Sequence, residues 1–182
     1  MKVLVVVDMQ NDFVTGSLGT PEAQAIVPNV KKKIEEYRNN GDTVIFTRDT
    51  HQEEYLLTKE GHKLPVEHCI EDTWGWMIVD ELSTEAWTSD IVNKPTFGSV
   101  DLCDVITNLE SKYAPSVVIE EIELSGLCTD ICVVSNALLL KTVFYDTIDI
   151  SVDATCCAGV TPETHEAALK TMEMCQINVK RG

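Results

Sequence analysis

Residues 2–8 read KVLVVVD, a short run of mostly β-branched side chains that ends at an acid. A continuous apolar run of this length predicts a strand buried on both faces, which is typical of parallel sheets. A second run of the same kind, TVIFT, covers Thr43–Thr47. Two such strands at the start of the chain favour a sheet that is covered by helices on both sides.

The rest of the chain alternates between strand and helix patterns. Further strands are expected at Asp90–Asn93, Ser116–Ile122, within Val143–Val152 and at Ile177–Lys180. Helices are expected at Pro28–Asn39, Asp101–Lys112 and Thr129–Lys141, and from Thr161, whose side chain would cap the helix that follows. This alternation predicts one α/β domain over residues 1–182, with a doubly wound, mostly parallel sheet and a Rossmann-like three-layer architecture.

Composition and charge exclude several classes of function. A net charge of −16 disfavours nucleic-acid partners, which need clustered lysine and arginine. No run approaches the length of a membrane span, and the start of the chain lacks the pattern of a signal peptide. The seven cysteines are an odd number, which a closed disulfide framework does not explain. We therefore expect a cytoplasmic protein with reduced thiols and no membrane partner.

Polar side chains follow the first two predicted strands, and ligands of parallel sheets bind beyond the carboxyl ends of the strands. Asp8 follows the first strand and is either a turn residue or an acid of the site. Asp49 and His51 follow the second strand, and two residues at this spacing point the same way and can share one metal ion. Glu60 and His68 would complete a mixed nitrogen and oxygen site suited to Zn, Fe or Mn, with His62 and Glu67 as rival ligands.

The stretch SGLCTDICVV, Ser125–Val134, contains two cysteines four positions apart. If Thr129 caps the following helix, Cys132 lies in the first turn, where the helix dipole lowers the pKa of a thiol. Cys128 lies before the cap and gains less from it. A nucleophile also needs a base and a charge partner, and Asp8 and Lys94 stand at neighbouring strand ends. The residues leave open whether Cys132 is a nucleophile or a buried thiol.

Six segments in one order carry a family resemblance: VDMQNDF, TRDTH, HCIEDTWG, NKPTFGS, GLCTDICV and DATCCAGVTPETHEAAL. The series resembles the isochorismatase-like cysteine hydrolases, and most of all their nicotinamidase-like branch. The resemblance implies a catalytic triad of Asp8, Lys94 and Cys132. It also implies an oxyanion hole from the backbone N–H groups of Cys128 and Cys132, after a cis peptide bond at Leu127–Cys128.

The same resemblance implies a metal site and a substrate pocket. The metal ligands would be Asp49, His51, Glu60 and His68, holding a divalent metal with zinc as the first expectation and iron or manganese as alternatives. Pocket residues would be Phe13, Leu64 and Phe97. Leu64 stands where this branch usually has an aromatic residue, which is a departure from the pattern.

The implied activity is hydrolysis of nicotinamide to nicotinate and ammonia through a cysteine thioester, as in NAD salvage. The alternative is hydrolysis of another small amide or carbamoyl substrate by the same triad. We expect a small-molecule amide as the ligand and a homo-oligomeric assembly. His165, in the last predicted helix, is interpreted as a surface residue.

Overall fold

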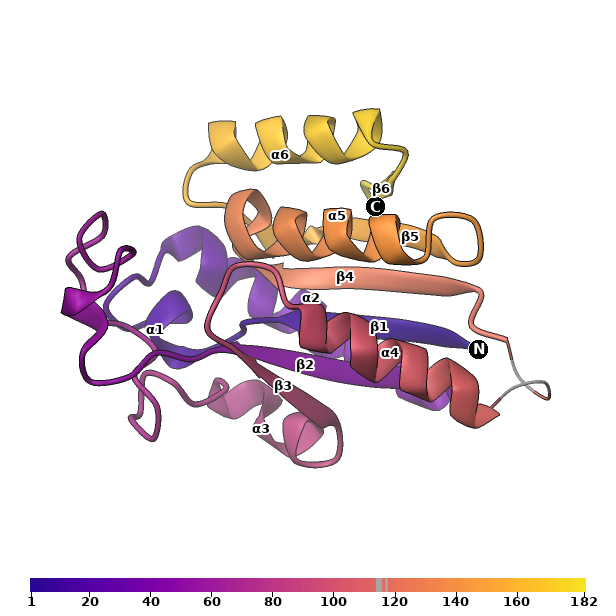
Figure 1. Cartoon of the computed structure of the whole chain (residues 1–182), viewed down its shortest axis with the longest axis horizontal. Helices are drawn as coiled ribbons and strands as arrows, with labels where there is room; N and C mark the ends of the chain where they lie inside the picture. The colour runs from indigo at the N-terminus through magenta and orange to yellow at the C-terminus, as the bar shows by residue number, and fades with distance from the viewer. Residues whose placement is uncertain (114–115, 117) are drawn as a thin grey trace.

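The computed structural model describes residues 1–113, 116 and 118–182, and it shows a parallel sheet between two layers of helices (Figure 1). The sheet has six strands in the order β3-β2-β1-β4-β5-β6, and every neighbouring pair is parallel. This is the strand order of a doubly wound Rossmann-like fold. The predicted fold class is confirmed. The strands are β1 Lys2–Val7, β2 Thr43–Asp49, β3 Asp90–Lys94, β4 Glu121–Leu127, β5 Asp149–Ala158 and β6 Asn178–Lys180.

Helices cover both faces of the sheet. They are α1 Asn11–Val14, α2 Pro21–Asn39, α3 Asp80–Trp87, α4 Val100–Tyr113, α5 Val134–Val143 and α6 Pro162–Met174, with a 3-10 turn at Tyr55–Leu57 and a π-helical turn at Thr129–Val133. One core cluster joins α4, α5 and α6 to the sheet, and a second joins α2 and α3 to its other face.

Strand β1 lies at the centre of the sheet and contributes to both cores. Val3, Val5 and Val7 pack into the first cluster, whereas Leu4 and Val6 pack into the second. All five side chains are fully buried, and each such side chain contributes about 1.5–3 kcal/mol to folding. The interpretation of this apolar run as a strand buried on both faces is confirmed.

Strands β4 and β5 lie further along the chain than the sequence predicted. Strand β4 begins at Glu121 rather than Ser116 and runs on through Ser125 and Gly126 to Leu127. Gly126 has a φ of +111°, and a Cβ there would lie 2.1 Å from the Val7 carbonyl oxygen, so only glycine fits beside β1. Part of the predicted range, residue 117, lies outside the described residues. Strand β5 starts at Asp149, because residues 144–148 form the turn that ends α5.

Helix α2 starts seven residues before the predicted Pro28. Thr20 caps it by accepting a hydrogen bond from the Ala23 N–H, and Pro21 occupies the first turn, so Pro28 lies inside the helix. The prediction that Pro28 lies in the first turn of this helix is therefore wrong, because Pro21 occupies that position. The cap at Thr161 is confirmed, since its side chain accepts the Thr164 N–H. Within the described ranges, no helix is long and apolar enough to cross a membrane.

Candidate active site

Three side chains from separate elements meet beyond the carboxyl ends of the strands. Lys94 Nζ lies 2.6 Å from Asp8 Oδ2 and 3.4 Å from Cys132 Sγ. Asp8 follows β1, Lys94 ends β3 and Cys132 lies in the π-helical turn after β4. Asp8 and Lys94 are fully buried, and Cys132 is 5% exposed. The acid, amine and thiol that the sequence singled out are therefore brought into direct contact.

Asp8 is held in place by β2. Its backbone has a φ of 48°, a left-handed conformation that aspartate tolerates better than most residues. The Thr47 hydroxyl donates to Asp8 Oδ1 over 2.6 Å, and the Asp8 N–H reaches the Thr47 carbonyl oxygen over 3.3 Å. These bonds leave Oδ2 facing Lys94.

Burial and mutual charge set the ionisation of the three groups. Burial raises the pKa of Asp8 above its usual range, although Lys94 opposes the shift. For Lys94, burial alone would lower the pKa, but the negative charges of Asp8 and Asp49 outweigh it and raise the pKa. Burial, followed by the Asp8 charge, raises the pKa of Cys132 well above the ordinary value. Burial and the neighbouring charges therefore favour the cationic form of Lys94 and the thiol form of Cys132.

The predicted lowering of the Cys132 pKa is wrong, and so is the predicted cap at Thr129. The residue before the turn is Cys128, and it makes no side-chain capping bond. The Thr129 hydroxyl is hydrogen-bonded to His165 Nδ1 over 2.8 Å instead. His165 is consequently half-buried rather than a surface residue, with its side chain 17% exposed. The cis peptide bond at Leu127–Cys128 is present as predicted.

Two buried amide side chains brace the site, and the sequence analysis did not single them out. Asn136 donates to the carbonyl oxygens of Cys132 (2.8 Å) and Phe97 (3.1 Å), which joins the nucleophile turn to the loop after Lys94. Gln10 accepts the Asp49 N–H over 2.7 Å and donates to the Asp49 carbonyl oxygen over 2.8 Å. Asn136 could have been found from the sequence, because it is a polar residue four positions after Cys132 in a largely apolar predicted helix.

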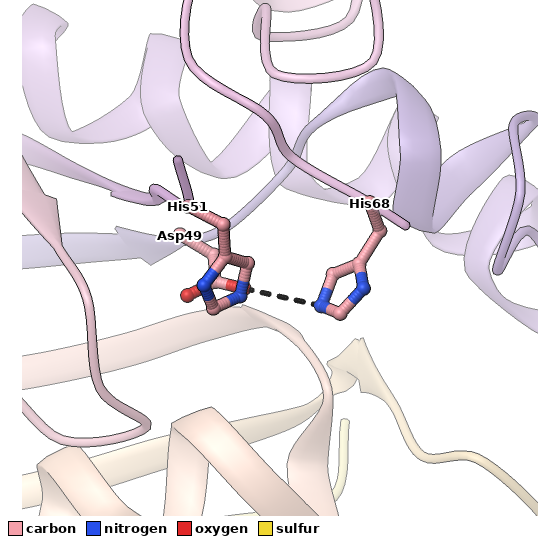
Figure 2. Close-up of side chains that lie close together, drawn as sticks. All are labelled: Asp49, His51 and His68. Carbon is pink, nitrogen blue, oxygen red and sulfur yellow. Dashed lines mark ion pairs between the residues drawn. The ribbon is translucent and has the colours of Figure 1, made fainter. Parts of the chain in front are cut away.

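Asp49, His51 and His68 form a compact group of potential metal ligands (Figure 2). One ligand atom from each lies within 4.8 Å of the others. Asp49 Oδ2 is 3.0 Å from His51 Nε2 and 3.6 Å from His68 Nε2. Glu60 stands at the edge of the group, with Oε1 3.7 Å from His51 Nε2 and 4.0 Å from His68 Nε2.

The polar atoms of this group fit a divalent cation. His51 Nε2 is buried and makes no hydrogen bond to the described residues. His68 Nδ1 is hydrogen-bonded to the Val66 carbonyl oxygen over 2.8 Å, which directs its Nε2 toward Asp49. Burial alone would raise the pKa of Asp49, but His51, His68 and Lys94 hold it below its usual range, so the carboxylate is charged. Imidazole with carboxylate suits Zn, Fe or Mn.

The rival ligands His62 and Glu67 lie apart from this group. Both are exposed, and neither belongs to the described cluster of ligand atoms around Asp49. His62 lines the cavity described next, whereas the Glu67 carbonyl oxygen accepts a hydrogen bond from the Ser17 hydroxyl. Asp49 also connects the two centres, because its Oδ1 lies 3.6 Å from Lys94 Nζ.

One cavity of about 800 Å³ opens onto both Cys132 and the metal-ligand group. The three predicted pocket residues, Phe13, Leu64 and Phe97, all lie on its wall, together with Cys128. The Phe13 ring lies 5.5 Å from the His68 ring between centroids. The wall is thus largely apolar around a nucleophile at one point and a cation site at another, which is a typical arrangement for small-molecule sites.

Comparisons with known proteins place this geometry among hydrolases. Residues 2–180 match the isochorismatase domain. A nicotinamidase from Saccharomyces cerevisiae is 24% identical, with the alignment covering 98% of this chain and 99% of the yeast protein.

Solved structures are similar over the whole chain. The nicotinamidase/pyrazinamidase PncA from Bacillus subtilis has a TM-score of 0.82 at 26% identity, and all of both chains is covered. An N-carbamoylsarcosine amidase from Thermoplasma acidophilum has a TM-score of 0.77 at 27% identity, covering 100% of this chain and 96% of its own.

Proposed function

Because this chain belongs to the isochorismatase family, we propose that it is a cysteine-dependent amide hydrolase that converts nicotinamide to nicotinate and ammonia. One observation carries the proposal. The Lys94 ammonium bridges the Asp8 carboxylate and the Cys132 sulfur at 2.6 Å and 3.4 Å, and Cys132 lines the same cavity as Asp49 and His68. A thiol, a base and a fixed cation are the parts that nucleophilic attack on an amide requires.

The first half of the reaction forms a thioester. Asp8, whose pKa is raised, takes the proton of the Cys132 thiol as the sulfur attacks the carboxamide carbon. The backbone N–H groups of Cys128 and Cys132 hold the resulting oxyanion, and such a donor is worth about 10²–10³ in rate. Asp8 then protonates the departing nitrogen, the C–N bond breaks and ammonia leaves. Lys94 keeps its charge and stabilises the thiolate while the proton is on Asp8.

The second half returns the enzyme to its starting state. Asp8 is again a carboxylate and takes a proton from a water molecule that attacks the thioester carbon. The C–S bond breaks, the acid is released and the Cys132 sulfur regains its proton. Each half uses Asp8 once as a base and once as an acid, which its raised pKa favours.

The metal site supports the choice of nicotinamide. Asp49, His51 and His68 would hold the ion, with Glu60 at the edge, and we propose zinc because imidazole and carboxylate ligands suit it. A bound metal supplies a Lewis-acidic position that can hold a ring nitrogen and so orient the substrate. In this proposal the whole chain is one domain, acts in the cytoplasm in NAD salvage and forms homo-oligomers.

A second candidate is another small amide or a carbamoyl compound. Leu64, which is 38% exposed on the cavity wall, is not the aromatic residue that a pyridine ring would stack against. The similarity to an N-carbamoylsarcosine amidase supports the same alternative. Ammonia release from nicotinamide, pyrazinamide, carbamoyl amino acids and ureidoacrylate separates the two candidates, and we expect nicotinamide to have the highest kcat/KM.

Separate substitutions of Cys132 and Cys128 test the mechanism. We expect Cys132→Ala to lower ammonia release by more than about 10⁴-fold, because the nucleophile is lost. Cys128→Ala is the matched control, since the proposal uses only its backbone N–H, and it should retain much of the activity. Full turnover by Cys132→Ala would remove the thioester from the mechanism.

A further inference from the structure

The π-helical turn Thr129–Val133, here called the nucleophile turn because it carries Cys132, is anchored by a helix near the end of the chain. Thr129 is the first residue of the turn and is fully buried. Its hydroxyl is hydrogen-bonded to Nδ1 of His165, a residue of α6, over 2.8 Å. Cys128, the residue before the turn, makes no side-chain capping bond to the described residues. The anchor of the turn therefore comes from α6 and not from the adjoining sequence.

The loop before α6 makes a second contact with the nucleophile turn. The Asp130 carboxylate accepts the Val160 N–H over 3.1 Å and 3.2 Å, but this contact is exposed. Gly159 packs against His165, since a Cβ at position 159 would lie 2.9 Å from the His165 Cβ. The bond between His165 and the buried Thr129 is better shielded from water, so we expect it to hold the turn more firmly than the Asp130 contact does.

Thr129 lies in the chain between the two backbone N–H groups that the proposed mechanism assigns to the oxyanion, those of Cys128 and Cys132. The turn is closed by hydrogen bonds from the Ile131 N–H (3.1 Å) and the Val133 N–H (3.0 Å) to the Cys128 carbonyl oxygen. Because the backbone passes through Thr129 from one oxyanion donor to the other, a shift of Thr129 would change the angle between the two N–H groups.

We infer that His165 is a positioning residue: its hydrogen bond to Thr129 holds the nucleophile turn so that the N–H groups of Cys128 and Cys132 converge on one oxygen atom. The inference rests on the proposed amide hydrolysis and deepens it. The oxyanion exists only once the sulfur has attacked, so the bond between His165 and Thr129 stabilises the transition state and not the bound amide. Its loss should therefore lower kcat and leave KM nearly unchanged.

A pair of substitutions at Thr129 tests the inference from the side of the turn. Thr129→Val keeps the shape of the side chain but removes the hydroxyl, and we expect kcat for ammonia release from nicotinamide to fall by about 10–100-fold, as for a small misplacement of reacting groups. KM should stay within about twofold of the wild-type value. Thr129→Ser keeps the hydroxyl and should retain most of kcat.

Substitutions at His165 test the same bond from α6. His165→Leu should lower kcat as Thr129→Val does, and the double variant should lose no more than either single variant, because all three lack the same bond. His165→Asn places a polar atom near the position of Nδ1 and should restore much of kcat.

Thr161→Ala is the control for a general weakening of α6. It removes the helix cap that accepts the Thr164 N–H over 3.2 Å, so it should lower Tm and leave kcat unaltered. The inference would be overturned by full kcat in Thr129→Val or His165→Leu, by additive losses in the double variant, or by an equal loss of kcat in Thr161→Ala.

Amide hydrogen exchange reads the anchor without any substrate. The Ile131 and Val133 N–H groups should exchange faster in Thr129→Val and His165→Leu than in the wild type, and they should not do so in Thr161→Ala. If the wild type releases no ammonia from nicotinamide, the proposed function fails but the anchor is still decided by exchange. Faster exchange in both variants would then support it, and unchanged exchange would overturn it.

Discussion

Two groups of paired charges occupy different parts of the same sheet. The site cluster, made of Asp8, Asp49, Lys94 and Cys132, lies at the carboxyl ends of the strands and sets one lysine against two carboxylates. The balanced cluster lies on β1, β4, β5, β6 and α2 and sets three lysines against three carboxylates: Lys2, Lys33, Lys180, Glu121, Glu123 and Asp153. The difference in charge balance separates a reactive centre from a structural one.

Each charge of the balanced cluster has close partners of opposite sign. Lys33 Nζ lies 2.7 Å from Glu123 and 2.6 Å from Asp153, and Lys180 contacts both Glu121 and Glu123. In the site cluster, burial and then the Asp8 charge raise the pKa of Cys132, and the excess negative charge can accept a divalent cation beside Asp49. Complete pairing stabilises the fold, whereas incomplete pairing provides a base, a thiol and a cation site.

Among the changes that compare the two clusters, the largest expected effect comes from removing the base in the site cluster. Asp8→Asn should lower kcat for amide hydrolysis by about 10²–10⁴-fold, because Asp8 is the base that takes the proton of Cys132 in the proposed mechanism. Asp153→Asn makes the same change in the balanced cluster and should leave kcat unchanged. Steady-state ammonia release by the two variants makes the comparison, and similar losses in both would erase the functional distinction between the clusters.

The second largest expected effect is a loss of metal affinity when a ligand in the site cluster's metal group is removed. His51→Ala removes a buried ligand, so we expect more than about a 100-fold weaker Kd for zinc, beyond the 10–100-fold typical of residues that only support ligands. Glu60→Gln should weaken zinc binding less, because Glu60 is 26% exposed and stands at the edge of the group. His62→Gln, a nearby imidazole outside the group, is the control. Competition with a fluorescent chelator measures all three, and a His62 effect equal to that of His51 would reassign the ligands.

A substitution in the balanced cluster should lower the free energy of unfolding and leave catalysis unaltered. Lys33→Met keeps the apolar stem but leaves Glu123 and Asp153 with fewer partners, which we expect to cost about 2 kcal/mol of the free energy of unfolding. The cost is below that of a fully buried pair, because Lys180 still contacts Glu123. Urea unfolding gives the free energy, and ammonia release should be unaltered. A loss of kcat without a loss of stability would contradict the assigned role.

The smallest expected effect is a decrease in the free energy of unfolding at low pH. Burial alone would raise the pKa of Glu121, but hydrogen bonds from Lys180, Lys2 and Ser151 lower it from 4.5 to about 2. Its stabilisation is therefore complete above about pH 4.5 and is lost as the pH falls toward 2. After allowance for solvent screening this amounts to about 1 kcal/mol.

Glu121→Gln provides the control for this pH dependence. The variant lacks the titrating carboxylate, so its unfolding free energy should fall less steeply than that of the wild type below pH 4.5. Unfolding curves at a series of pH values give both slopes. Parallel slopes would show that Glu121 is not linked to folding.

Much of the fold could be predicted from local pattern, because apolar runs and helix caps are local signals. Strand β1 and the cap at Thr161 were found in this way. The ends of β4 could not be found, because the polar stretch from Glu123 to Gly126 is a strand only by virtue of its neighbours β1 and β5. Position along parallel strands explains why Asp8, Lys94 and Cys132 could be proposed together before any distance was known.

The electrostatics of the site could not be read from local pattern. The position of Cys132 in the first turn of a helix predicted a lowered pKa, but burial beside the Asp8 carboxylate reverses the direction. Thr129 has the residue type of a helix cap, yet its hydroxyl binds His165, which is distant in the sequence. Burial and long-range partners decide these properties, and neither is encoded in a short window of sequence.

The central claim is that one cavity presents a single small amide to Cys132 and to the metal ligands at once. A crystal structure of Cys132→Ala with zinc and nicotinamide tests it most directly. We expect the carboxamide carbon beside position 132 and the ring nitrogen at a zinc ion held by Asp49, His51 and His68. A ring bound away from the zinc, or an amide turned away from position 132, would contradict the account.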